Sequence, residues 1–124
     1  MNQIRKIAWG AILLLDLYDC NPKKINDKKL LKEFSKELCK VVDMKPYKNT
    51  ELVNFGVGKI KGISTHQWIY TSSITIHFDN QFGNQVMLDL FTCKKFDKKI
   101  AVNFAKNYFE GKVLRAKLIQ RGHR

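Results

Sequence analysis

Hydroxyl, imidazole and thiol side chains gather in the middle of this 124-residue sequence. Alternation along one predicted strand places five polar or aromatic side chains on a single face: Ser64, His66, Trp68, Tyr70 and Ser72. His77 lies in the next predicted strand, and Cys93 follows the strand after that. Such groups can serve as nucleophile, proton acceptor and proton donor. Each also has a structural interpretation, because single serines, histidines and cysteines in strands are usually hydrogen-bonded or buried.

The segments that carry these residues alternate with a period of two, which is typical of β-strands. We expect strands near residues 51–55, 63–71, 73–79 and 85–92. A glycine-rich turn separates the first two, and residues 79–84 predict a hairpin loop before the last. A buried apolar strand over residues 7–18 precedes them, and a strand over 113–119 follows.

Two amphipathic helices are predicted between these strands. Asp27 opens the first helix, which must end before Pro46. Its apolar stripe consists of Leu30, Leu31, Phe34, Leu38, Val41 and Val42. Asp97 caps the second helix, and Gly111 stands at its C-terminal end. The second stripe consists of Ile100, Ala101, Phe104, Ala105 and Tyr108.

The order β-α-β-β-β-β-α-β predicts an α+β fold. We expect a two-layer α/β sandwich in which a mainly antiparallel sheet carries two helices on one face. Two helices cannot cover both faces of such a sheet, so the open face needs a partner, and we expect a homodimer. The length, and a sequence free of repeats and linkers, indicate a single domain over residues 1–124.

The composition restricts the class of protein. Apolar residues make up 44% and charged residues 27%, which favours a folded chain. No apolar run approaches the ~18 residues of a membrane span, and no secretory signal surrounds Arg5 and Lys6. The cysteines at positions 20, 39 and 93 match neither a disulfide framework nor a zinc site. We expect a cytoplasmic protein without a metal ion and without membrane contact.

The net charge of +12 raises the question of a nucleic-acid partner. Lysines outnumber arginines 19 to 4 and are scattered in pairs, whereas arginine is the better ligand for phosphates and base edges. The densest basic stretch is the C-terminal one: Arg115, Lys117, Arg121, His123 and Arg124. Scattered lysines are typical of a solvated surface, so we do not expect a nucleic-acid partner.

Two segments together resemble a known family. The run Ser72-Ser73-Ile74-Thr75-Ile76-His77 is followed, sixteen residues after its histidine, by the cysteine of Asp89-Leu90-Phe91-Thr92-Cys93. This combination is similar to the prokaryotic S-adenosylmethionine (AdoMet) decarboxylase proenzymes, which depend on a pyruvoyl group. The resemblance extends to the segment from Gly10 to Cys20, to the following helix and to Gly62-Ile63-Ser64, and so covers nearly the whole chain.

The resemblance implies a zymogen that matures by autocatalytic cleavage before Ser72. Cleavage would leave a β chain, residues 1–71, and an α chain, residues 72–124, whose first residue becomes the pyruvoyl group. In the family this group forms a Schiff base with the substrate amine and accepts electrons while CO2 leaves. The implied activity is that of a carboxy-lyase, and the implied role is polyamine (spermidine) biosynthesis.

Further residues acquire roles from the same resemblance. Cys93 matches the family's proton donor, His77 the proton acceptor in self-cleavage, and Ser64 a residue that assists it. Ser64 and Ser72 would lie roughly 26 Å apart on one extended strand, so they cannot meet within it. In the family the site spans a dimer interface. Ser72 and Cys93 would then come from one subunit, and Ser64 and His77 from the partner.

The same resemblance implies two substrate-binding positions, and the charge of the substrate suggests further ones. Gln81 occupies the place of a family glutamate that binds the ribose hydroxyls, and Phe55 is close to the place of an aromatic that stacks on adenine. Asp16, Asp19 and Asp89 are candidates for the negative charge that a cationic sulfonium substrate needs. Asp89 also has a structural interpretation as a hydrogen-bonding acid.

Several positions depart from the family pattern. Thr71 and Ser73 replace the glutamate and histidine that flank its pyruvoyl serine, Ile12 replaces an early histidine, and Lys94 replaces a glycine. The residues for pyruvoyl chemistry are present, whereas those around the nucleoside differ. Three hypotheses follow: an AdoMet decarboxylase, a decarboxylase of ornithine or arginine on the same scaffold, or a non-cleaving homologue that binds a ligand or partner.

Overall fold

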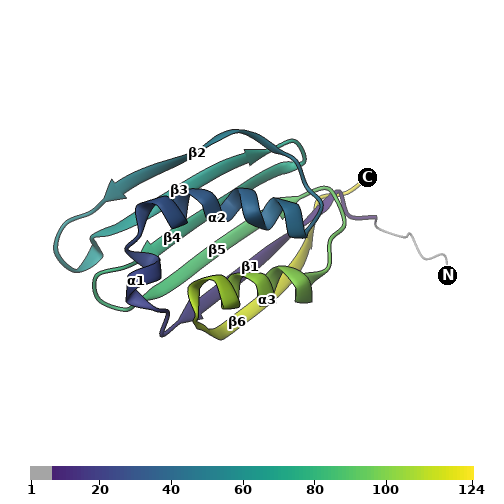
Figure 1. Ribbon diagram of the computed structural model, residues 1–124. Helices are drawn as coiled ribbons and strands as arrows, with labels where there is room; N and C mark the ends of the chain where they lie inside the picture. Colours follow the sequence, from purple (N-terminus) through teal and green to yellow (C-terminus); the bar gives the residue numbers. More distant parts are fainter. Residues whose placement is uncertain (1–6) are drawn as a thin grey trace.

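The computed structural model describes residues 7–124, which form a six-stranded antiparallel sheet with three α-helices on one face (Figure 1). The elements in chain order are β1 (Gly10–Tyr18), α1 (Pro22–Ile25), α2 (Lys28–Val41), β2 (Pro46–Phe55), a 3₁₀ turn η1 (Gly58–Ile60), β3 (Gly62–Ile69), β4 (Ser72–Asp79), β5 (Gln85–Thr92), α3 (Lys98–Phe109) and β6 (Lys112–Arg121). The strands lie in the order β2-β3-β4-β5-β1-β6. The two-layer α+β architecture predicted from the sequence is confirmed.

The two long helices begin where aspartates predict them. The Asp27 carboxylate accepts hydrogen bonds from the backbone N–H groups of Lys29 and Leu30, and so caps α2. Asp97 caps α3 in the same way, by accepting from Lys99 and Ile100. Each cap satisfies N–H groups that the first turn of a helix leaves without partners.

The core lies between the helices and one face of the sheet. Alternate residues of the central strands are buried there: Leu13, Leu15, Leu17, Ile74, Ile76, Phe78, Val86, Leu88 and Leu90. Phe34 of α2 packs against Phe104, Tyr108 and Phe109 of α3, with ring centroids 4.7–5.7 Å apart. This aromatic cluster fixes α2 against α3, and the sheet thereby becomes a supported platform for residues on its other face.

The structure corrects the predicted strand that carried the hydroxyl and imidazole groups. β3 ends at Ile69, which pairs with Ser72, so Tyr70 and Thr71 form the turn of a tight hairpin. The prediction that Tyr70 and Ser72 share a strand face with Ser64 is therefore wrong. Tyr-Thr carries none of the glycine, asparagine or aspartate that usually indicate a two-residue hairpin turn.

Other boundaries also differ from the predictions. The short helix α1, which begins at Pro22 behind the cap residue Asn21, was not predicted, so the sheet carries three helices instead of two. β1 begins at Gly10, and β2 is longer than expected because it starts at Pro46, a residue that edge strands tolerate. The region of Arg5 and Lys6, where the sequence shows no secretory signal, lies outside the described residues.

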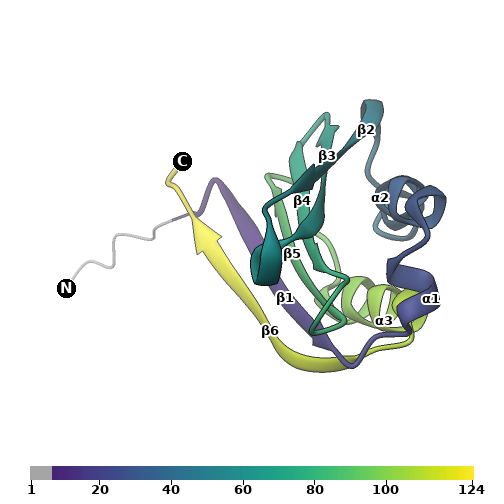
Figure 2. The ribbon, with the colours of Figure 1, turned by 90° about the vertical axis from the view of Figure 1, so that its left-hand side faces the viewer.

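The second face of the sheet has no helix on it within residues 7–124 (Figure 2). The strand register places the following side chains there: Ser64, His66 and Trp68 of β3; Ser73, Thr75 and His77 of β4; Met87, Asp89 and Phe91 of β5; Ile12, Leu14 and Asp16 of β1. We call this surface the open face. Among the described helices, none is long and apolar enough to cross a membrane.

Candidate active site

Ser72 occupies the first position of β4 in an unusual backbone conformation. Its φ is 153°, a region that non-glycine residues rarely adopt. The strand register pairs it with Ile69 of β3 and with Thr92 of β5, so it is held on both sides. A strained residue held by two neighbouring strands is a feature found preferentially at functional sites.

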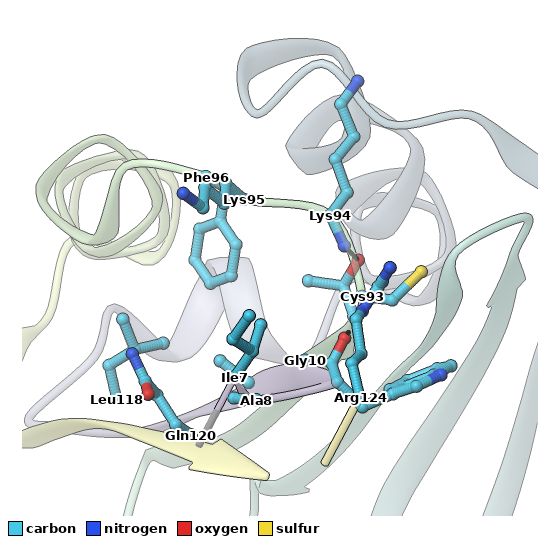
Figure 3. A pocket seen from close by; sticks show the side chains of 13 residues that line it. Ile7, Ala8, Gly10, Cys93, Lys94, Lys95, Phe96, Leu118, Gln120 and Arg124 are labelled. Carbon is cyan, nitrogen blue, oxygen red and sulfur yellow. Dashed lines mark hydrogen bonds between the residues drawn. The ribbon is translucent and has the colours of Figure 1, made fainter. Parts of the chain in front are cut away.

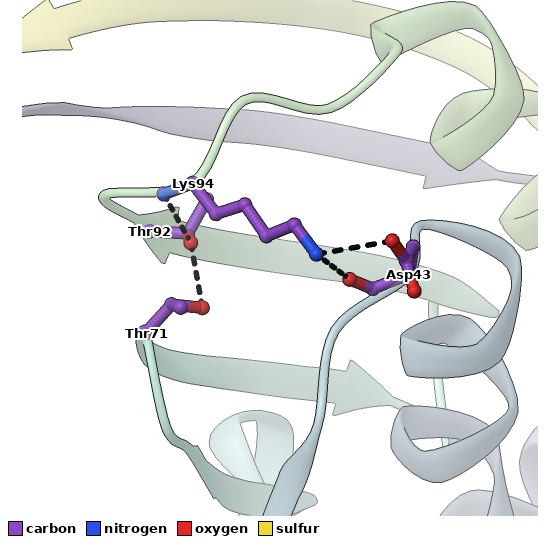
Figure 4. A network of polar contacts seen from close by, with 4 residues as sticks. All are labelled: Asp43, Thr71, Thr92 and Lys94. Atoms are coloured by element: carbon purple, nitrogen blue, oxygen red, sulfur yellow. Dashed lines mark hydrogen bonds and ion pairs between the residues drawn. The ribbon is translucent and has the colours of Figure 1, made fainter.

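The residue before it, Thr71, is fixed to the end of β5 by two hydrogen bonds. The Cys93 N–H donates to the Thr71 carbonyl oxygen (3.1 Å), and the Thr92 hydroxyl donates to Thr71 Oγ1 (2.9 Å). The Lys94 N–H in turn donates to Thr92 Oγ1 (3.0 Å), as Figure 4 shows. The carbonyl of the Thr71–Ser72 peptide bond therefore already has one N–H donor aimed at its oxygen.

Lys94 also ties this turn to the end of α2. Its ammonium group donates to the Asp43 backbone carbonyl and lies 3.1 Å from Asp43 Oδ2 (Figure 4). Both side chains are exposed, so the ion pair adds little to the free energy of unfolding. Its effect is geometric, because it connects residues 51 positions apart in the sequence.

Ser64 and His77 form a second group on the open face. They are directly paired across β3 and β4, and Ser64 Oγ lies 2.7 Å from His77 Nδ1. A neutral imidazole that bonds a hydroxyl through one nitrogen keeps the other nitrogen for proton transfer. The pair predicted from the sequence thus lies within hydrogen-bonding distance.

The two groups stand apart within one chain. His77 is five residues from Ser72 on β4, which is about 16 Å at ~3.3 Å per residue. Cys93, in contrast, lies beside Ser72, because its N–H bonds the preceding residue. The structure therefore brings Ser72 together with Cys93, and Ser64 together with His77, but separates the first pair from the second.

Acidic side chains lie near His77 on the open face. Asp89 of β5 pairs with Thr75 and is thus diagonal to His77, and Asp16 of β1 pairs with Met87. Partial burial raises the pKa of Asp89, the neighbouring His77 lowers it, and the negative charge of Asp16 adds to the rise. Asp16 also forms a 3.4 Å ion pair with Arg115 of β6. The third acidic candidate, Asp19, lies beyond the end of β1 and pairs with Lys112 instead.

The predicted substrate-binding residues lie at the opposite end of the sheet from Ser72. Phe55 ends β2 and is 57% exposed, while Gln81 lies in the exposed β4–β5 loop. Asp79 shapes that loop by accepting hydrogen bonds from Phe82 N, Gly83 N and Gln85 Nε2. Phe55 and Gln81 therefore belong to the same end of the molecule as the β2–β3 and β4–β5 loops, and not to the end that holds Cys93.

A cavity of about 880 Å³ opens beside Cys93. Figure 3 shows Cys93, Gly10 and Arg124 on one side of it, and Phe96 and Leu118 on the other. Lys94, Lys95 and Arg124 contribute positive charge, and no acidic side chain is among the lining residues from the described part of the chain. The cavity gives the Cys93 region access to solvent.

An aromatic and cationic group that the sequence did not single out lies next to Cys93. Phe91 packs against Trp9, with ring centroids 5.7 Å apart, and the Arg121 guanidinium lies 5.1 Å above the Phe91 ring. Thr92 and Lys94 were likewise missed as partners of Thr71. Only their position next to Cys93 could have indicated them, since the contacts arise from strand pairing rather than from a local pattern.

The donor set does not resemble a metal centre. Residues 7–124 contain no group of three or more histidine, cysteine, aspartate or glutamate side chains placed to hold a metal ion. The end of β5 and the start of β4 instead fit a group made from Ser72 itself. There a serine with a strained φ follows a carbonyl that is already hydrogen-bonded, and a thiol-bearing residue lies beside it.

Comparisons with known proteins give the family and the fold of the chain. The sequence model of the family described as S-adenosylmethionine decarboxylase matches residues 11–122. The crystal structure of the adenosylmethionine decarboxylase from Aquifex aeolicus VF5 is similar in fold, with a TM-score of 0.76 and 19% sequence identity over 94% of this chain and 93% of that chain. The family match spans nearly the whole sequence, including both groups of site residues. The chain belongs to the S-adenosylmethionine decarboxylase family.

Proposed function

We propose that this protein is a pyruvoyl-dependent decarboxylase of AdoMet, matured by self-cleavage of the Thr71–Ser72 peptide bond. The observation that carries the proposal is the Thr71 carbonyl, which accepts the Cys93 N–H at 3.1 Å directly before a serine with a φ of 153°. The product of AdoMet decarboxylation serves spermidine biosynthesis, which is the role we propose for the chain.

Self-cleavage begins when the Ser72 hydroxyl oxygen attacks the Thr71 carbonyl carbon. The Oγ–C bond forms, the C–N peptide bond breaks, and the hydroxyl proton passes to the Ser72 nitrogen, which leaves an ester. The Cys93 N–H stabilises the oxygen that becomes negatively charged during this step. A base then removes the Ser72 α-proton, the Cβ–Oγ bond breaks, and Thr71 leaves as a carboxylate. Water hydrolyses the resulting enamine to a pyruvoyl group and ammonia.

His77 is the base that we assign to the elimination step, with Ser64 holding its ring. We assign the tautomer in which the His77 Nδ1–H donates to Ser64 Oγ across the 2.7 Å contact, because this leaves Nε2 unprotonated and able to accept the proton. His77 of the same chain lies about 16 Å from Ser72 along β4, far beyond the reach of one proton transfer. The histidine that serves Ser72 therefore belongs to another subunit.

A homodimer formed through the open face meets this requirement. Trp68 on that face is 55% exposed, and polar groups such as Ser64 and His77 accompany it. Rotation about a two-fold axis that lies between the sheets and runs across the strands exchanges the two ends of β4. The Ser72 end of one subunit then faces the His77 end of its partner, and each dimer contains two shared sites.

Substrate binding follows from the same exchange of ends. Phe55 and Gln81 of the partner approach Ser72 and Cys93, so the nucleoside and the amino-acid parts of AdoMet contact different subunits. The pyruvoyl group, once formed, supplies a carbonyl that bonds the substrate amine and accepts the electrons released with CO2. Cys93 then delivers a proton to the substrate α-carbon. The carboxylates of Asp16 and Asp89 offset the positive charge of the sulfonium.

We propose that residues 1–124 form one domain, and that cleavage leaves residues 1–71 and 72–124 associated through the sheet. We place this chemistry in the cytoplasm, the compartment that keeps thiols such as Cys93 reduced. No metal ion takes part in the steps above. Ornithine and arginine are not favoured as substrates, because both comparisons name AdoMet decarboxylases.

Two measurements test the proposal. Intact mass spectrometry under denaturing conditions should give two chains that separate between Thr71 and Ser72, with the second chain blocked at its N-terminus. Release of labelled CO2 from carboxyl-labelled AdoMet should accompany it and stop in Ser72→Ala. A full-length mass with no CO2 release would leave a non-cleaving, ligand-binding homologue. Release of CO2 from ornithine or arginine but not from AdoMet would show that the protein is a pyruvoyl-dependent decarboxylase with a different substrate.

A further inference from the structure

The backbone of Ser72 already has the geometry that its own attack requires. In an L-residue the Cβ atom is displaced by about 120° from the carbonyl carbon around the N–Cα bond. A φ of 153° therefore leaves the torsion from the Thr71 carbonyl carbon to the Ser72 Cβ at roughly 30°. The attack closes a five-membered ring through these atoms, and such a ring needs a small torsion at this bond.

An ordinary strand residue could not close this ring. With φ near −120° the same torsion is roughly 120°, which turns Cβ and its hydroxyl away from the preceding carbonyl carbon. The conformation of Ser72 is costly for a residue with a side chain, so contacts with the surrounding structure must hold it.

The contacts that hold this peptide bond come from two consecutive residues of β5. Thr92 bonds the side chain of Thr71, and Cys93 bonds its carbonyl oxygen. The side-chain and carbonyl hydrogen bonds together prevent Thr71 from rotating relative to β5, whereas the carbonyl hydrogen bond alone would allow this rotation. Ser72, which pairs with Thr92 on one side and Ile69 on the other, must accommodate the resulting direction of the chain.

The surroundings of the Thr92 hydroxyl fix the direction of its hydrogen bond to Thr71. The side chain is 1% exposed, so water does not compete for it. The Lys94 N–H donates to its oxygen, which leaves the hydroxyl hydrogen for Thr71 Oγ1. In this way a buried hydroxyl that both donates and accepts a hydrogen bond connects the turn after β5 to the residue that carries the scissile carbonyl.

We propose that Thr92 is a positioning residue for the first step of self-cleavage. Its hydroxyl holds Thr71 so that Ser72 keeps the strained φ and its Oγ faces the Thr71 carbonyl carbon. The Thr92 hydroxyl bonds the side chain of Thr71 and not the reacting atoms, so it acts through Thr71. This inference rests on the proposed function, because it assigns a role within the self-cleavage of the same bond.

The test compares three single-residue variants of the precursor with the wild type. Thr92→Val replaces the hydroxyl by a methyl group of similar shape, and Thr92→Ser keeps the hydroxyl. Thr65→Val is the matched control, because Thr65 is also a strand threonine at 1% exposure, and its Oγ1 has no hydrogen-bond partner within residues 7–124. The rate of cleavage of freshly synthesised precursor is followed by intact mass spectrometry.

We expect Thr92→Val to slow cleavage by about tenfold or more, consistent with loss of one buried hydrogen bond. Thr92→Ser should stay within about threefold of the wild-type rate, and Thr65→Val should match the wild type. Cleavage of Thr92→Val at the wild-type rate would overturn the inference. Should Thr92→Val not fold, as judged by circular dichroism, Thr71→Val against Thr71→Ser makes the same comparison from the other end of the hydrogen bond.

A second readout separates positioning from a general loss of stability. In His77→Ala the ester should accumulate, because the base for elimination is missing, and hydroxylamine should cut it between residues 71 and 72. Adding Thr92→Val to His77→Ala should lower the amount of hydroxylamine-sensitive ester, whereas adding Thr65→Val should not. Equal amounts of ester in the two double variants would contradict the positioning role.

The design also distinguishes the inference from the proposed function. If the wild type neither cleaves nor yields a hydroxylamine-sensitive ester, then self-cleavage itself is absent and the proposed function fails. If the wild type cleaves and Thr92→Val cleaves equally fast, the proposed function stands and only the role of Thr92 is wrong.

Discussion

Ser64 Oγ lies 2.7 Å from His77 Nδ1 across the β3–β4 pairing, and the two side chains form a hydrogen-bonded pair on the open face. This pair is about 16 Å along the strand from Ser72. In the proposed mechanism a protomer carries one half of a processing site at each end of β4, and neither half is complete alone.

Complementation between two inactive variants tests this arrangement. Ser72→Ala and His77→Ala should each fail to mature when expressed alone. When the two chains are co-expressed, mixed dimers should cleave, because Ser72 of one chain meets His77 of the other. Only the chain that carries His77→Ala should be cut, and intact mass spectrometry can identify it. No cleavage in the mixture would contradict a shared site, and cleavage of His77→Ala on its own would contradict the role of His77 as the base.

The open face should be the surface that forms the dimer. Trp68→Asp introduces a charge at a side chain that is 55% exposed on this face, and we expect it to give a monomer in light scattering and to lose self-cleavage. Ile100→Asp is the matched control, because Ile100 is 49% exposed on the helix layer. A dimer that survives Trp68→Asp but not Ile100→Asp would place the interface on the helices.

The three cysteines should differ in reactivity. Burial raises the pKa of Cys39 to about 11, and burial together with the Asp19 carboxylate raises that of Cys20 to about 11. Cys93 is only half-buried, so iodoacetamide at pH 8 should modify Cys93 and leave the other two untouched. Peptide mapping by mass spectrometry measures this, and labelling of Cys20 or Cys39 as fast as Cys93 would contradict it.

The same two thiols predict how stability depends on pH. Their pKa values are raised in the folded state, so the unfolded chain loses these protons first. The free energy of unfolding should therefore fall as the pH rises from about 9 to about 11. Urea denaturation across this range measures the fall, and Cys39→Ala should make it shallower. An unchanged slope in Cys39→Ala would show that other groups cause it.

The elements of the fold were predictable because their signals are local. Asp27 and Asp97 cap the two long helices as their positions indicate, and the alternation in β4 and β5 matches the observed burial. The turn at Tyr70 was not predictable, since its residue types are typical of strands. The contacts of Thr92 with Thr71, 21 positions away, depend on strand pairing, which no local pattern encodes.

Gly111 follows the end of α3, where the sequence places the stop of that helix. The left-handed residue there is Glu110, with a φ of 51°. Gly111 is needed instead because a Cβ there would lie 2.6 Å from Cys20 Sγ. Close packing between the segment before α1 and the segment after α3 thus requires glycine at position 111.

A double-mutant cycle tests this explanation. Gly111→Ala should lower the free energy of unfolding by about 1–3 kcal/mol, as overpacking usually does. In a Cys20→Ala background the cost should be clearly smaller, because the sulfur is gone. Urea denaturation of the four proteins gives the coupling energy. A cost that is the same in both backgrounds would mean that the Tyr18 carbonyl, 3.3 Å from the same Cβ, is the limiting contact.

The loop residue Gln81 gives the clearest test of the substrate. If it faces the ribose hydroxyls of AdoMet, then Gln81→Glu replaces a neutral acceptor by a charged one, which forms hydrogen bonds roughly twice as strong. We expect the KM for AdoMet to fall several-fold with little change in kcat. Asn84→Asp is the control, because it adds the same charge to the same loop. At physiological salt, charges more than ~8 Å apart are largely screened. An equal fall in the KM of both variants would therefore indicate simple attraction of the cationic substrate by added negative charge. An unchanged KM in Gln81→Glu would show that Gln81 does not belong to the nucleoside site.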